Sequence, residues 1–234
     1  MTEARAYWDA HHHRNDSETV PCDDWLQRFE DVIERCQTPV IDLGCGRGND
    51  TKHLISRGKC VIACDFSSQA IRNIRKNFPE VSGTVCFDMT DPFPFEDNFT
   101  DLIIADLSLH YFSEQVTESV LAEIKLVLTP NGVLLFRVNS VKDFHYGAGQ
   151  GTEVERNYFR TADGRFKRFF DLDDIHRFFG SWNILYLKEE QMDRYDYPKM
   201  LWTAMCRSQD GFAEGKSTKA SADKSADFRQ NGMA

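Results

Sequence analysis

A short apolar strand that runs directly into three alternating glycines constrains this chain more than any other feature. The stretch reads Pro39-Val-Ile-Asp-Leu-Gly-Cys-Gly-Arg-Gly-Asn-Asp-Thr51. Val40 to Leu43 has the composition of a buried strand. Gly44, Gly46 and Gly48 remove side chains where the backbone must turn tightly and where a ligand can approach. The stretch therefore predicts a strand, a tight loop and a helix arranged around a bound ligand.

The spacing of the glycines separates two kinds of ligand loop. Asn49 is expected to cap a helix that continues to about Arg57 and ends at Gly58. The dinucleotide fingerprint G-x-G-x-x-G, counted from Gly44, would require a glycine at position 49. Asp42 instead precedes the first glycine by two residues, so the pattern is Asp-x-Gly-x-Gly-x-Gly.

Charge and length limit the partners of the chain. The 234 residues suit one domain with a sizeable core. Lys and Arg number 28 against 37 Asp and Glu, a net charge of −9, which repels nucleic acid and anionic membrane surfaces. We therefore expect a small-molecule partner, no nucleic acid and no membrane.

Cysteine usage and the hydrophobic runs indicate a cytoplasmic protein. The cysteines number seven, an odd count, and several lie in or beside apolar strand candidates, where cysteine behaves as a small hydrophobe: Cys45, Cys60, Cys64 and Cys86. We expect no leader peptide, and no apolar stretch reaches the roughly 18 residues of a spanning helix.

The N-terminal region gives one clear element. Residues 1 to 22 contain Tyr7-Trp8 and His11-His12-His13 without a regular pattern. Apolar residues at helical spacing then predict an amphipathic helix from Asp23 to Cys36: Trp25, Leu26, Phe29, Val32 and Ile33. Adjacent histidines do not share a helical face, so we expect no metal site from them and Cys22.

Strands and helices alternate from residue 39 to residue 139. Further strands are predicted at Lys59–Cys64, Thr84–Phe87, Phe99–Ala105 and Val133–Val138, with helices from Ser67 or Ser68 to Phe78 and from Ser113 to Leu128. This alternation favours an open, mostly parallel sheet with right-handed crossovers. Asp65, Asp88 and Asp106 follow successive strands, so they should meet at the ligand-binding edge of that sheet.

The alternation stops after Asn139. Ser140 to Glu155 is predicted to be a long loop that covers the site, and Asn157 to Phe170 a hairpin turning at Asp163-Gly164. Basic residues gather there: Arg156, Arg160, Arg165, Lys167 and Arg168. A helix from Asp171 to Phe179 and antiparallel strands at Trp182–Leu187 and Lys199–Cys206 follow. The tail from Ser208 has a disordered composition.

The motif and its context resemble class I S-adenosylmethionine-dependent methyltransferases over about residues 38–207. The turn Thr129-Pro-Asn-Gly132 and a final antiparallel strand are also similar to that family. The resemblance implies an α/β fold with a single Rossmann-like, doubly wound, mostly parallel seven-stranded sheet and a C-terminal antiparallel strand. Residues 1–37 would then form an N-terminal helical cap, and residues 208–234 a disordered tail.

The same resemblance implies a cofactor site for S-adenosylmethionine. Asp65 would hold the ribose hydroxyls with Phe66 beside the adenine, and Asp88 with Met89 would lie at the adenine edge. The methionine end would meet the glycine loop, and Asp106 completes the expected cofactor residues. The loop residues are Asp42, Gly44, Cys45 and Gly46.

The acceptor side is less constrained by the resemblance. Ala105-Asp-Leu-Ser-Leu-His-Tyr-Phe112 lacks the Asn/Asp-Pro-Pro-Tyr/Phe of enzymes that methylate base amines, and resembles small-molecule enzymes, including some tellurite methyltransferases. His110 with Tyr111 is the predicted catalytic pair, with His110 acting as a base or only shaping the cavity. Ser108, Arg160 and Arg168 are further predicted substrate contacts, the arginines favouring an anionic substrate.

Two alternatives stay open from the sequence. An NAD-linked oxidoreductase would share the acid at position 65 but needs the glycine that position 49 lacks. A fold that binds S-adenosylmethionine without catalysis is the other, because a fold alone does not imply an activity.

Overall fold

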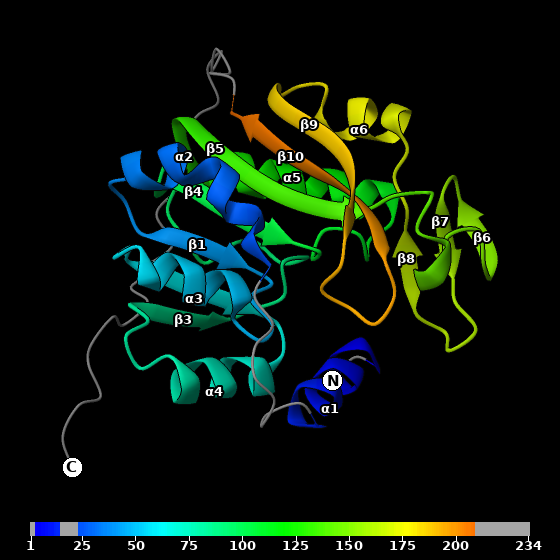
Figure 1. Ribbon diagram of the computed structural model, residues 1–234, viewed down its shortest axis with the longest axis horizontal. Helices are drawn as coiled ribbons and strands as arrows, with labels where there is room; N and C mark the ends of the chain where they lie inside the picture. Colours follow the sequence, from blue (N-terminus) through cyan, green and yellow to red (C-terminus); the bar gives the residue numbers. More distant parts are fainter. Residues whose placement is uncertain (1–2, 15–22, 209–234) are drawn as a thin grey trace.

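A seven-stranded sheet runs through the computed structural model, which describes residues 3–14 and 23–208 (Figure 1). Its strand order is β3-β2-β1-β4-β5-β10-β9, and β10 runs antiparallel to both of its neighbours. This confirms the predicted mostly parallel sheet and its C-terminal antiparallel strand. The strands are β1 (Val40–Leu43), β2 (Val61–Asp65), β3 (Gly83–Cys86), β4 (Thr100–Asp106), β5 (Leu128–Asn139), β9 (Asn183–Met192) and β10 (Lys199–Arg207).

Helices cover both faces of this sheet. One face packs on α5 (Glu114–Val127) and α6 (Leu172–Phe179), and the other on α3 (Asn49–Ser56), α4 (Ser68–Asn77) and the pair η1 (Asp24–Phe29) and α2 (Glu30–Arg35). Every residue of β1 and β2 is buried, as expected for parallel strands between two helical layers. Side chains alternate between the layers: Ile41 joins the core beneath α5, whereas Val40 joins the core beneath α2.

A second, smaller sheet lies beside the carboxyl ends of the parallel strands. It contains β6 (Thr152–Glu155), β7 (Tyr158–Arg160) and β8 (Phe166–Arg168), and a short helix η2 (Phe144–Tyr146) precedes it. The predicted hairpin around Asp163-Gly164 is therefore confirmed. Figure 1 shows this sheet, the loop between β9 and β10, and the N-terminal helix α1 (Glu3–Arg14) on the same side of the molecule.

Several local predictions differ from the structure; one of them is the turn expected at Thr129–Gly132, which lies within β5. The helix expected over Asp23–Cys36 is split into η1 and α2, because three residues per turn places Leu26 and Phe29 on the same buried side. Gly48, not Asn49, is the N-cap of α3; at its φ of 84°, an added Cβ would lie 2.5 Å from the Phe78 ring. The segment expected as a loop before residue 156 contains η2 and β6.

The proposed division of the chain into a cap, a domain and a tail stays a prediction. Trp25, Leu26 and Phe29 pack in the same core as Val40, so the described part of the cap shares the interior of the sheet. Residues 209–234, the greater part of the predicted tail, lie outside the described residues. Within residues 3–14 and 23–208, no helix has the length and apolarity needed to cross a membrane.

Candidate functional site

One cavity of about 910 Å³ lies at the carboxyl ends of the parallel strands. This volume is near the upper end of the roughly 300–1,000 Å³ of small-molecule sites. Most of the residues predicted from the sequence line it together: Asp42, Gly44, Cys45, Gly46, Asp65, Phe66, Asp88, Met89, Asp106, Ser108, His110 and Tyr111. The predicted convergence of strand ends on one site is therefore present in the structure.

The glycine loop closes against the segment that follows β4. A Cβ added to Gly44, whose φ is 80°, would lie 2.4 Å from the Ser108 Cβ, so no larger residue fits there. The Ser108 hydroxyl donates a hydrogen bond to the Leu43 carbonyl oxygen at 2.8 Å. Ser108 thus joins the ends of β1 and β4 at the floor of the cavity.

Asp65 ends β2 with both carboxylate oxygens directed by the backbone. One oxygen accepts from the Gly46 amide at 3.0 Å and the other from the Ser67 amide at 2.8 Å. Burial raises the pKa of Asp65 to about 6, although these amide hydrogen bonds act in the opposite direction. The group is fixed in place and has lone pairs left for a ligand in the cavity.

Two other buried acids have opposite electrostatic surroundings. Asp42 accepts a hydrogen bond from the Thr51 hydroxyl, and burial, with the Asp106 charge nearby, raises its pKa to about 7. Burial alone would also raise the pKa of Asp106, but Arg137 and Arg194 lower it well below its usual value. Both Asp106 oxygens accept from these guanidinium groups at 2.7–2.8 Å. Asp106 is therefore an ionised member of a buried charge network.

His110 lies buried in the wall of the cavity. Its side chain is 2 % exposed, and its Nδ1 has no hydrogen-bond partner. Burial, together with Lys199 and Lys167, lowers its pKa well below the usual value, so the imidazole is neutral at pH 7. The Tyr111 ring lies 4.3 Å from it, between centroids, and burial raises the pKa of this phenol.

The two arginines expected to contact substrate do not line the cavity. Arg160 on β7 is exposed. Arg168 on β8 is fully buried, and its guanidinium pairs with Glu155 and donates to the carbonyl oxygens of Phe112 and Arg156. Its neighbour Lys167 lines the cavity instead.

Several cavity residues were not singled out by sequence reasoning. Arg165 and Lys167 belong to the predicted basic group, but only the folded hairpin shows which of its members face the cavity. The others that matter below are Tyr146, Arg194, Tyr195 and Lys199. They come from loops or strand ends that are remote in sequence, so no local pattern identifies them.

Helix α1 forms one wall of the cavity with Tyr7, Trp8, His11 and His12. Trp8 and His12 are four residues apart, a spacing that predicts neighbouring side chains on one face of a helix. Their rings stack with centroids 5.8 Å apart. Asp9 anchors the helix, because it accepts from the Ser67 hydroxyl and from the Gln69 amide.

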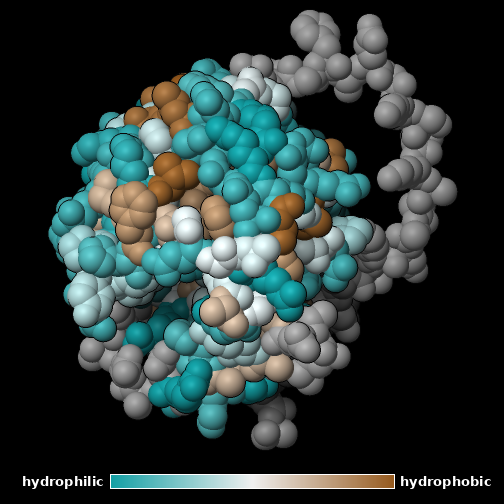
Figure 2. All heavy atoms as spheres, turned by 90° about the vertical axis from the view of Figure 1, so that its right-hand side faces the viewer, coloured by the Kyte–Doolittle hydropathy of each residue, from teal (hydrophilic) through white to brown (hydrophobic). Residues whose placement is uncertain are grey.

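The face of the molecule that carries β6, β7 and β8 shows a mixed surface in Figure 2. Figure 2 shows hydrophobic residues scattered among hydrophilic ones. Scattered apolar residues are usual on a protein surface, so among the described residues this face gives no sign of a further binding patch. Across residues 3–14 and 23–208, no group of three or more His, Cys, Asp or Glu side chains could hold a metal ion.

Comparisons with known proteins agree with this geometry. Residues 40–132 match a family model described as a methyltransferase domain. An uncharacterized methyltransferase of Oceanobacillus iheyensis is 31% identical over 110 residues, covering 47% of this chain and 51% of that protein. The tRNA N(3)-methylcytidine methyltransferase Mettl2 of Drosophila melanogaster is 28% identical over 211 residues, covering 82% of this chain and 64% of that protein. The alignments thus span about half to two thirds of these relatives.

Solved structures share the fold. The Burkholderia thailandensis 1,6-didemethyltoxoflavin-N1-methyltransferase, determined with 1,6-didemethyltoxoflavin and S-adenosylhomocysteine bound, superposes with a TM-score of 0.63 at 16% identity. The superposition covers 88% of this chain and 88% of that chain.

Proposed function

We propose that this chain, as a class I S-adenosylmethionine-dependent methyltransferase, transfers a methyl group from S-adenosylmethionine to a small-molecule acceptor. One observation carries the proposal. A single cavity joins the carboxyl ends of β1, β2 and β3 to the buried His110 and its neighbours beyond β4. Cofactor and acceptor can therefore meet without leaving the protein interior.

The residues of the β1–β3 half fit the cofactor. Asp65 offers a fixed carboxylate for the ribose hydroxyls, and Phe66 with Met89 offers apolar surface for the adenine. Asp88 is held by the amide and hydroxyl of Thr90 at the same edge. When bound, S-adenosylmethionine supplies an electrophilic methyl group that needs only an aligned nucleophile.

The groups after β4 would orient the acceptor. His110 has an unpartnered Nδ1 and is neutral at pH 7, so it can accept a proton or a hydrogen bond from a hydroxyl or amine acceptor. The Tyr111 ring packs against it and against Trp8 of α1. These side chains would bind the acceptor and exclude water.

An RNA base is the second candidate acceptor. The similarity to a tRNA methyltransferase over 82% of this chain favours it. The net charge of −9 favours a small molecule, because RNA binding depends on basic surface that neutralises phosphates. In this chain, Lys167 and Arg165 line the cavity itself.

Labelled S-adenosylmethionine separates these candidates. The purified chain is incubated with pools of small metabolites and, separately, with total tRNA, and the products are analysed for label; Asp65→Ala is the control of impaired cofactor binding. Label in a small molecule that depends on Asp65 supports the proposal. Label confined to tRNA would favour the second candidate. Cofactor binding without any labelled product would leave a binding module.

A further inference from the structure

The half of the cavity over β4, β5 and β10 is lined by cationic side chains. Arg165 and Lys167 come from the β7–β8 hairpin, Arg194 from the loop after β9, and Lys199 from the start of β10. The nearest strand end of this half contributes Asp106, whose charge is already shared by two arginines. Asp106 therefore cannot neutralise the other cations of this half, and each of them needs a carboxylate partner of its own.

All of these cations except Lys167 form an ion pair with a carboxylate. The closest distances are 2.6–2.8 Å, in the pairs Arg165–Asp163, Arg194–Asp106 and Lys199–Asp143. Lys167 Nζ donates to the Tyr146 carbonyl oxygen at 3.1 Å, and no carboxylate of residues 3–14 and 23–208 forms an ion pair with it. Within the described residues, Lys167 is thus the one of these four cations that has no ion pair, although the Asp143 and Asp163 charges act on it from beyond ion-pair distance.

The buried surroundings of Lys167 make its positive charge destabilising for the fold. Burial, then the Lys199 charge, lowers the pKa of Lys167 to about 8 against the opposing charges of Asp143 and Asp163, so the ammonium form still predominates at pH 7. A desolvated charge without a partner destabilises a fold, whereas a ligand of opposite charge would relieve this. His110 shares this environment, because Lys199 and Lys167 both act on its imidazole. Its unpartnered Nδ1 is a second polar group that a ligand could satisfy.

We infer that Lys167 binds an acidic group of the methyl acceptor, a carboxylate or a phosphate, while His110 contacts the acceptor beside it. The inference rests on the proposed function and names the substrate class. Lys167 here takes the role that the sequence assigned to Arg160 and Arg168, which lie outside the cavity. The acceptor would be a small organic acid whose nucleophilic atom lies toward the cofactor half.

The carboxylate of the cofactor is the competing partner for Lys167. Topology favours the acceptor, because Asp65, Asp88 and the glycine loop belong to β1, β2 and β3, whereas Lys167 contacts the η2 segment that follows β5. A substitution at Lys167 should therefore leave the dissociation constant of the cofactor unchanged.

Binding is tested first, without turnover. Protein labelled with ¹⁵N-lysine and saturated with S-adenosylhomocysteine is titrated with inorganic phosphate, and in parallel with formate, at constant ionic strength. The Nζ resonance of Lys167 is assigned by its loss in Lys167→Met. A saturable shift of this resonance that chloride does not cause is expected, while the exposed Lys52 does not respond. A Lys167 resonance that neither anion moves would overturn the inference, whether or not the protein methylates anything.

Turnover then tests the role in recognition. Carboxylic acids and their matched primary amides are offered with labelled S-adenosylmethionine. Lys167→Met should raise KM for an accepted acid by roughly tenfold or more. Lys167→Arg should have a smaller effect on this KM, and the control Lys52→Met should not change it. Unchanged KM in Lys167→Met, acceptance of the amides as readily as the acids, or a weakened cofactor in place of a raised KM would each contradict the assignment.

Discussion

At the scale of single residues, Asp65 fixes the glycine loop and, in the proposed assignment, would also bind the cofactor. Its carboxylate is held by the amides of Gly46 and Ser67, so the glycine loop, the second strand and the start of α4 are fixed by one side chain. Ser67 in turn caps α4 through the Ala70 amide. The same contacts that position the carboxylate therefore also stabilise the local structure.

The affinity for S-adenosylmethionine should fall in acid because of Asp65. In the proposed assignment the ionised carboxylate would accept hydrogen bonds from the ribose hydroxyls, and burial raises its pKa to about 6. Below that pH, protonation competes with binding, so Kd should rise about tenfold per pH unit, whereas above it Kd should level off. Calorimetry between pH 5 and 8 measures this. Asp65→Asn should bind about tenfold to a hundredfold more weakly at pH 7.5 and lose this slope; an unchanged slope would remove the ribose assignment.

Kinetics can distinguish whether His110 acts as a base or only packs in the cavity wall. A base acts in the neutral form, so kcat of the wild-type protein should fall only at a pH below the usual histidine value, because burial lowers the pKa of His110. His110→Ala should then reduce kcat by about a hundredfold or more, with the cofactor Kd kept, and abolish that acid limb. A variant that keeps kcat and the pH profile would assign His110 to packing alone, and would point to an acceptor that needs no deprotonation.

At the scale of elements, the sequence predicts the central sheet well and its cover less well. Apolar runs bounded by glycines and acids predict β1 to β5. β1 and β2 are buried along their whole length, as parallel strands between helices are, whereas the edge strand β3 is only partly buried. Parallel strands joined by right-handed crossovers have their carboxyl ends at one edge of the sheet, so the acids that follow these strands reach the same cavity. Which hairpin residues face inward depends on how β6, β7 and β8 pack on the loop after β4, and no local pattern contains that information.

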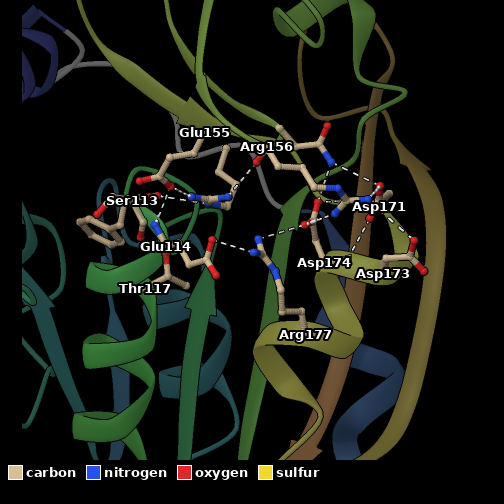
Figure 3. A network of polar contacts seen from close by, with 12 residues as sticks. Ser113, Glu114, Thr117, Glu155, Arg156, Asp171, Asp173, Asp174 and Arg177 are labelled. Carbon is tan, nitrogen blue, oxygen red and sulfur yellow. Dashed lines mark hydrogen bonds and ion pairs between the residues drawn. The ribbon is translucent and has the colours of Figure 1, made fainter.

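A polar network attaches the cover to the two helices beneath it. Figure 3 shows Arg177 between Glu114 of α5 and Asp174 of α6, and Arg156 beside Asp171 and Asp174. The Glu155 carboxylate accepts from the Glu114 amide, so β6 also contacts the start of α5. The cover is therefore attached at the amino-terminal ends of both helices.

Arg168 is expected to anchor this cover, and Arg160 offers a matched control on the neighbouring strand. Arg168→Met removes the ion pair to Glu155 and the hydrogen bonds to Phe112 and Arg156, so the free energy of unfolding should fall by about 3 kcal/mol. Arg160 is exposed, so Arg160→Met should change it by less than about 0.5 kcal/mol. Urea unfolding measures both. Equal effects of the two substitutions would show that Arg168 does not fasten the cover.

At the scale of the whole molecule, acids concentrate in the cofactor half of the cavity and cations in the other half. Asp42 on β1, Asp65 at the end of β2 and Asp50 on α3 are all buried, and burial raises the pKa of each. For Asp50, the nearby Arg137 charge acts in the opposite direction to burial. Under the proposed function, a cofactor with a positively charged sulfonium would bind in the half of the cavity where these buried carboxylates lie.

This arrangement should make the cofactor-free protein less stable as the pH rises, and Asp42 isolates the effect. Its pKa is about 7 when folded against an ordinary 3.8, so its contribution to stability is fully present below about pH 4 and is lost as the pH rises through 7. The free energy of unfolding of Asp42→Asn should therefore rise relative to that of the wild type over this range, by on the order of 2 kcal/mol or more at pH 7.5. Urea unfolding at pH 4.5, 6 and 7.5 measures the difference, with the exposed Asp91→Asn as control. Parallel stability curves for Asp42→Asn and wild type would show that the Asp42 carboxylate is solvated or paired in the folded protein.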